Sequence, residues 1–127
     1  MRFRHATFEV VNANFFRGAA LFGLLAVALG AFGAHALKAT LIANGTAEIW
    51  NKAVLYHLVH AVVLLALALS GTQNRGAFVC FLLGIVIFSG SLYLLALTNL
   101  RWLGAITPFG GLCFLAGWAW LIISPGR

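Results

Sequence analysis

Four long apolar stretches dominate this sequence and constrain its fold more than any other feature. They cover residues 15–36, 49–69, 77–97 and 101–123, and short polar segments separate them. A helix that crosses a bilayer needs about 20 consecutive apolar residues, and each stretch is about that long. The pattern predicts an all-α integral membrane protein, a four-helix bundle with short loops.

The composition excludes a water-soluble fold. Of 127 residues, 63% are hydrophobic and 8% are charged, whereas a soluble domain carries about 25% charged residues. The net charge of +6 would suggest nucleic acid as a partner of a soluble protein. In a membrane chain, scattered basic residues act instead as topology and headgroup signals. We therefore expect the lipid bilayer as a partner and no nucleic acid.

The two ends differ from the spans. Residues 1–14 mix basic and apolar side chains, which predicts an amphipathic amino-terminal arm at the headgroup boundary. Residues 124–127 form a short tail after the four-helix domain of residues 15–123. The first apolar stretch ends in a small-x-small triplet around His35, a feature of signal peptides. We expect a retained helix there.

The distribution of Lys and Arg predicts the orientation. With four spans, both termini and the second loop share one side, which holds five of the eight basic residues: Arg2, Arg4, Arg17, Arg75 and Arg127. The other side holds Lys38, Lys52 and Arg101. Because the more basic side faces the cytoplasm, both termini are predicted to be cytoplasmic, and the other end of the bundle is the outer end.

Local signals mark the helix ends. Asn44-Gly45 supplies a left-handed residue, and Thr46 is a candidate cap of the next helix. Four tryptophans near span ends are typical of interfacial belts: Trp50, Trp102, Trp118 and Trp120.

Polar side chains within the spans are predicted to gather in the outer half. This candidate polar layer consists of His35, His57, His60, Ser89, Ser91, Tyr93 and Thr107. Such groups either form hydrogen bonds between helices or build a proton or small-molecule site, and both interpretations remain open.

The histidines allow a further interpretation. His57 and His60 are three residues apart and share a helix face. With His35 they would supply three nitrogen ligands, which suit zinc, copper or haem iron. The residues permit such a site without requiring it, so we expect no cofactor, with metal or haem as an alternative.

Pro108 predicts a break in the last span. It removes one backbone hydrogen bond and crowds the carbonyl of Gly104, so the helix should kink or unwind. An outward-facing cavity beside a discontinuous helix is the functional interpretation. A packed proline kink is the structural one.

Small residues predict close helix packing. Ala26, Gly30 and Ala34 recur along the first span, and Gly110 and Gly117 lie on one side of the fourth. Their spacing does not distinguish packing within the chain from packing against another subunit. Glu9 and Glu48 are the only acids, so chemistry by paired carboxylates is excluded, and we expect no enzyme.

Four strings carry a family resemblance: residues 30–37 (GAFGAHAL), 56–61 (YHLVHA), 88–97 (FSGSLYLLAL) and 101–111 (RWLGAITPFGG). They resemble the bacterial domain-of-unknown-function family four-two-three, which is similar to the eukaryotic transmembrane protein two-five-six. The resemblance implies a small, multi-pass protein of the bacterial inner membrane with four helices. It implies no established activity, substrate or cofactor.

Three functions remain as hypotheses. The first is an interaction or accessory subunit that packs against itself or a larger membrane complex through its small-residue stripes. The second is an oligomeric small-molecule or proton-linked transporter that uses the polar layer and the Pro108 break. The third is a histidine-based metal or haem protein.

Overall fold

The computed structural model describes residues 12–71 and 74–125 and is helical throughout its regular elements. In chain order these are α1 (Ala13–Ala34), α2 (Lys38–Asn44), α3 (Ala47–Leu69), α4 (Arg75–Gly84), the π-helix η1 (Ile85–Ser89), α5 (Gly90–Thr98), the 3-10 helix η2 (Arg101–Ala105) and α6 (Thr107–Ile123). Four helical segments are long and apolar enough to cross a membrane: α1, α3, the continuous run from α4 to α5, and η2 with α6. The predicted all-α, four-span fold is confirmed.

The chain ends lie largely outside the described residues. Of the predicted amino-terminal arm, only residues 12–14 are described, and there Asn12 caps α1 by accepting a hydrogen bond from the backbone of Asn14 at 3.1 Å. Of the predicted tail, residues 126 and 127 are outside. The interfacial arm therefore stays a prediction.

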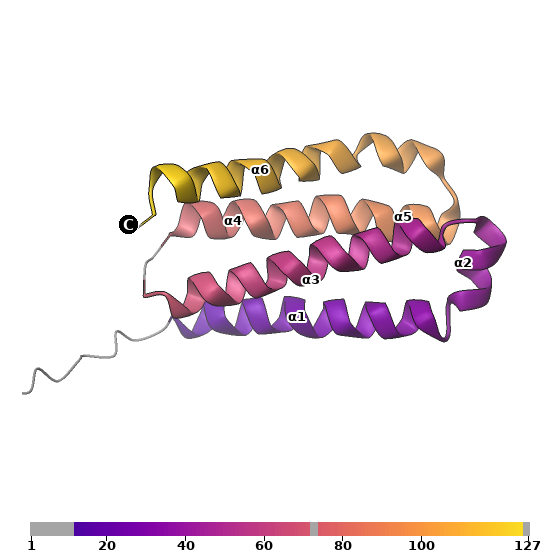
Figure 1. Cartoon of the computed structure of the whole chain (residues 1–127), viewed down its shortest axis with the longest axis horizontal. Helices are drawn as coiled ribbons and strands as arrows, with labels where there is room; N and C mark the ends of the chain where they lie inside the picture. The colour runs from indigo at the N-terminus through magenta and orange to yellow at the C-terminus, as the bar shows by residue number, and fades with distance from the viewer. Residues whose placement is uncertain (1–11, 72–73, 126–127) are drawn as a thin grey trace, which may run out of the picture.

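The spans are arranged in a row (Figure 1). α3 lies between α1 and the α4–α5 run, and α6 packs along the far side of that run. The beginning of α1 and the end of α6 are at one end of the molecule, and α2 is at the other, here called the α2 end. α1 buries only two residues, Ala19 and Ala26, whereas α3 buries seven. The central helices thus hold the core, and α1 and α6 flank it.

Glycines and aromatic rings join α4 to α6. The ring of Phe81 lies against Gly117, and that of Phe114 lies against Gly84. A Cβ atom at Gly110 would collide with the backbone of Phe88 in η1. Small residues therefore let these two helices approach closely within one chain.

The stripe on α1 is also used mainly inside the chain. Ala26 is fully buried, and a Cβ atom at Gly30 would lie 3.3 Å from the Val54 side chain of α3. Ala34, by contrast, is exposed. The stripes thus explain intramolecular packing and, apart from Ala34, leave little small-residue surface for another subunit.

Two predictions at the α2 end need correction. Gly45 has the expected left-handed φ of 65°, but Thr46 does not cap α3 with its side chain. Its hydroxyl donates to the carbonyl of Ala96 at 2.7 Å and so caps the carboxyl end of α5. Trp50 is not interfacial: it is 1% exposed, and its indole donates to the Leu29 carbonyl of α1 at 3.0 Å. Both side chains satisfy backbone carbonyls of a neighbouring helix instead.

Candidate functional site

The candidate polar layer is divided into separate hydrogen-bonded contacts. His57 of α3 is 4% exposed, and its Nδ1 lies 2.9 Å from the Tyr93 hydroxyl of α5. Its Nε2 is the one buried side-chain nitrogen or oxygen left without a hydrogen bond among the described residues. His57 therefore links α3 to α5 and has one unused nitrogen.

Both ring nitrogens of His60 are occupied. Nδ1 lies 2.8 Å from the Tyr56 carbonyl, and Nε2 accepts a hydrogen bond from the Trp118 indole at 3.2 Å. Because Nε2 accepts, the proton is assigned to Nδ1. The imidazole also stacks on Phe114 with 3.8 Å between ring centroids. Trp118, predicted as an interfacial residue, is thus the α6 partner of His60.

The hydroxyl groups also join neighbouring helices. Ser89 donates to the Ala53 carbonyl of α3 at 2.8 Å, and Ser91 and Thr107 share a hydrogen bond of 2.7 Å between α5 and α6. Ser89 and Ser91 are buried. Interhelical hydrogen bonding therefore accounts for most of the polar side chains in the spans.

The three histidines do not form a metal centre in the part of the chain that is described. His35 is exposed at the end of α1, whereas His57 and His60 are buried on α3. No group of three or more His, Cys, Asp or Glu residues that could hold a metal is present there. The hypothesis of a three-histidine ligand set consequently has no geometric support.

The predicted break in the last span is present. The chain forms a 3-10 helix over Arg101–Ala105, and α6 begins at Thr107 with Pro108 in its first turn. The amide of Ile106 donates to the Leu103 carbonyl at 3.0 Å. Because the first turn of a helix does not use its amides within the helix, Pro108 is accommodated there without a kink. The backbone therefore unwinds locally, as the sequence predicts.

A hollow lies beside this break. It has a volume of about 430 Å³ and is lined by Lys52, Tyr56, Phe88, Leu92, Gly104, Thr107 and Pro108. A second hollow of about 190 Å³ is lined by Leu55, Tyr56, Val59 and His60. Tyr56 lines both, so they adjoin. We call the two together the α3–α6 groove. In the first hollow α3 faces η2–α6 across Phe88 and Leu92, whereas all four residues that line the second hollow belong to α3.

Lys52 gives the groove its charge. The side chain is exposed and lies five residues after the start of α3, about 8 Å along the helix at 1.5 Å per residue. It forms no ion pair with any described residue, including Glu48 one turn earlier. The remaining lining is apolar apart from the hydroxyl groups of Tyr56 and Thr107 and the imidazole of His60, so the groove has a cation at one end and mainly apolar side chains below it.

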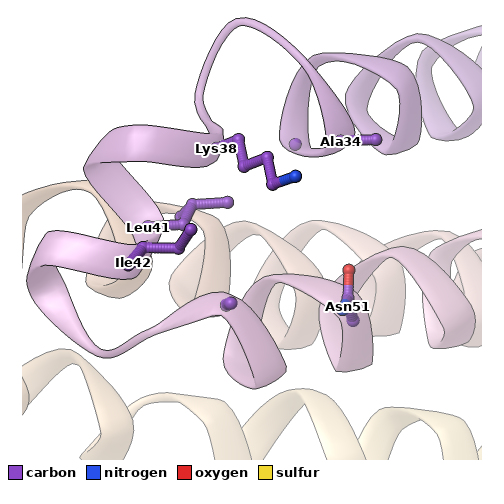
Figure 2. Close-up of a pocket in the computed structure, with 7 residues that line it drawn as sticks. Ala34, Lys38, Leu41, Ile42 and Asn51 are labelled. Atoms are coloured by element: carbon purple, nitrogen blue, oxygen red, sulfur yellow. The ribbon is translucent and has the colours of Figure 1, made fainter.

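A separate cavity of about 390 Å³ lies at the α2 end, lined by Gly33, Ala34, Lys38, Leu41, Ile42, Ala47 and Asn51. Figure 2 shows Lys38 of α2 and Asn51 of α3 extending into the space between these helices and α1. Both side chains are exposed. This cavity provides a second lysine for comparison with Lys52.

The sequence interpretation found Thr107, Gly104 and Pro108 but missed Lys52 and Tyr56 as site residues. A signal was available, because Lys52, Tyr56 and His60 are spaced four residues apart and so share one helix face. This spacing alone did not indicate a binding site, because the residues opposite α3 come from the η2–α6 segment, which is distant in the sequence.

The model of the family described as a protein of unknown function, DUF423, matches residues 29–111. The chain is 49% identical over 110 residues to a UPF0382 membrane protein of Staphylococcus haemolyticus, covering 83% of this chain and 88% of that protein. It is 40% identical over 112 residues to the UPF0382 membrane protein YwdK of Bacillus subtilis, covering 83% and 89%. It is 43% identical over 116 residues to the UPF0382 inner membrane protein YgdD of Escherichia coli, covering 86% of each. No solved structure matches the chain.

The segment matched by the family model contains the residues that carry the family resemblance. All four quoted strings, from residue 30 to residue 111, lie within the matched segment, and so does every residue that lines the α3–α6 groove. The chain therefore belongs to the DUF423 family, the UPF0382 membrane proteins.

Proposed function

We propose that this protein is a non-enzymatic membrane protein that holds one membrane amphiphile in the α3–α6 groove. The observation that carries the proposal is Lys52, a cation without an ion pair in the described chain, at one end of a groove lined mainly by apolar side chains. A molecule with a polar head and an apolar body fits that arrangement. This is the small-molecule branch of the transporter hypothesis.

The interior polar groups favour binding over proton transfer. His60, Ser89 and Ser91 are all engaged in hydrogen bonds within the bundle. A proton relay needs groups that exchange partners along a path, and these side chains form separate bonds between packed helices. The proposal therefore does not include proton coupling.

The groove lining also favours binding over catalysis. It contains the amine of Lys52, the hydroxyl groups of Tyr56 and Thr107 and the imidazole of His60, but no acid or thiol. Both nitrogens of His60 are already hydrogen-bonded, to the Tyr56 carbonyl and to the Trp118 indole. The Thr107 hydroxyl is bonded to Ser91 at 2.7 Å. Since a nucleophile needs an adjacent base to activate it, this set supports a non-enzymatic role.

We place the protein in the bacterial inner membrane with both termini in the cytoplasm. The relative in Escherichia coli is an inner membrane protein by name. Five of the eight Lys and Arg residues lie on the side of the termini, which favours that side as cytoplasmic. In this orientation the Lys52 end of the groove belongs to the outer leaflet.

An accessory or oligomeric role is the second candidate, and α1 favours it. Only two of its 22 residues are buried, and Leu21, Leu24 and Val27 are each more than half exposed. This surface is available to another membrane protein or to a second copy. Mass measurement after gentle solubilisation tests it, because a lone monomer without a co-purifying protein would contradict this second role.

A pair of glycine variants tests the amphiphile proposal. A Cβ atom at Gly104 would meet only Leu95, at 3.6 Å, whereas nothing lies within 4 Å of one at Gly23 on α1. Gly104→Phe should fill the groove, and Gly23→Phe is the matched control. Native mass spectrometry of protein released from lipid nanodiscs should show one retained lipid per chain for the wild type and for Gly23→Phe. Gly104→Phe should reduce that retained fraction at least about fivefold, as the loss of roughly 1 kcal/mol of binding implies. Equal retention by all three proteins would refute the proposal.

A further inference from the structure

We infer that the α3–α6 groove is a site for a lipid with an anionic phosphate headgroup, which lies at Lys52 while one acyl chain runs toward His60. This inference rests on the proposed function and names the chemistry of its ligand. It depends on three features of the groove: its charge, its length and its volume.

The charge selects an anionic head. Lys52 forms no ion pair in the described part of the chain, and no carboxylate lines the groove. An ammonium group within a span is stabilised by an opposite charge or by reaching the interface. Lys52 is about 8 Å from the start of α3, close enough to extend toward the headgroup layer. The phosphate of a lipid is the anion that the bilayer supplies at that depth.

The Tyr56 hydroxyl near Lys52 complements the same head. Tyr56 is exposed and its hydroxyl forms no hydrogen bond to a described residue. Thr107 lines the opposite wall and shares its hydroxyl with Ser91. Because the Thr107 proton is used within the chain, Lys52 and the Tyr56 hydroxyl are the donors left for a ligand in the upper part of the groove, and both suit phosphate oxygens.

The length selects an acyl chain. From Lys52 to His60 the wall of α3 spans eight residues, about 12 Å at 1.5 Å per residue. Half of a hydrocarbon core of about 30 Å is about 15 Å. The groove therefore matches one leaflet. Its lower part is lined by Leu55 and Val59 and ends at His60. Both ring nitrogens of His60 already have hydrogen-bond partners within the bundle, so an acyl chain beside them would leave neither nitrogen unpaired.

The volume of the groove suits one small ligand. The upper hollow is about 430 Å³ and the lower one about 190 Å³, within the range of small-ligand pockets, about 300–1,000 Å³ in total. A single acyl chain fits a space of this size.

A competition between headgroups tests the inference. The full chain is placed in nanodiscs of equal parts phosphatidylglycerol and phosphatidylcholine with identical acyl chains, and retained lipid is identified by native mass spectrometry. The wild type should retain phosphatidylglycerol over phosphatidylcholine by about fivefold, the ratio expected from one lysine at an anionic surface. Lys52→Gln should bring the ratio close to one while one lipid is still retained. Lys52→Arg should restore the preference.

The controls separate this inference from the proposed function. Lys38→Gln, in the cavity at the α2 end, should leave the ratio unchanged. A wild type that retains one lipid without headgroup preference overturns the inference but leaves the proposed function standing. A bare monomer, or a dimer without lipid, overturns both. Loss of the preference upon addition of inorganic phosphate, with no lipid retained, would identify a free-anion site and overturn the lipid assignment.

Discussion

At the scale of single residues, side chains that the sequence presents as functional candidates hold neighbouring helices together. Tyr93 bonds His57, Trp118 bonds His60, and Trp50 bonds the Leu29 carbonyl. The hydrocarbon core of a bilayer holds no water to form hydrogen bonds, so a polar side chain there is stabilised by a hydrogen bond to a neighbouring helix. The sequence placed these residues in the spans but did not identify their partners, because each partner is on another span.

Tyr93→Phe should destabilise the protein by about 0.5–1.5 kcal/mol, since it leaves the His57 Nδ1 without its partner in a buried site. Tyr56→Phe is the matched control, because the Tyr56 hydroxyl has no hydrogen bond to a described residue. Reversible unfolding in mixed micelles with increasing dodecyl sulfate measures both. Equal stability of the two variants would show that the His57–Tyr93 contact contributes nothing.

At the scale of elements, the α4–α6 interface depends on local departures from the α-helix. The π-helix Ile85–Ser89 brings the backbone of Phe88 against Gly110. The 3-10 helix before Thr107 lets α6 begin beside the groove. The second departure could be predicted from Pro108, which removes a donor. The first could not, because π-helices are rare and residues 85–89 carry no proline or glycine that would indicate a departure from the α-helix.

Gly110→Ala should cost about 1–3 kcal/mol, because its methyl group would collide with the Phe88 backbone and must push α6 away from η1. Gly23→Ala should be neutral or stabilise by up to about 1 kcal/mol, because nothing lies within 4 Å and alanine favours helix. The same unfolding titration compares them. A Gly110→Ala variant as stable as Gly23→Ala would contradict the close approach of α6 to η1.

At the scale of the whole molecule, the α3–α6 groove depends on how the four spans are arranged, because its lining comes from three of them. The four apolar stretches predicted four helices, and the short loops indicated that consecutive spans lie side by side. The pattern did not reveal that Lys52 and Tyr56 of α3 line one hollow with Gly104, Thr107 and Pro108, because these two segments are far apart in the sequence. The sequence thus predicted the fold and one wall of the candidate site, and the opposite wall required the tertiary arrangement.

The orientation of the whole molecule can be tested by labelling. In a background without Cys80 and Cys113, Lys38→Cys at the α2 end should react with a membrane-impermeant maleimide in intact spheroplasts, whereas Arg75→Cys should react only after lysis. Both positions are exposed. The expected pattern follows from the excess of basic residues on the side of the termini. The reverse pattern would place the termini outside and assign the groove to the inner leaflet.

Photo-cross-linking of the wild-type chain tests whether a lipid occupies the α3–α6 groove. A phosphatidylglycerol with a diazirine in one acyl chain is incorporated into vesicles with the protein, irradiated, and the adducts are mapped by peptide mass spectrometry. Adducts should be concentrated at the groove, on Leu55, Tyr56, Val59 and Leu92. Adducts spread evenly over the exposed faces of α1 and α6, such as Leu24 and Leu115, would show ordinary lipid contact and contradict a lipid site between α3 and α6.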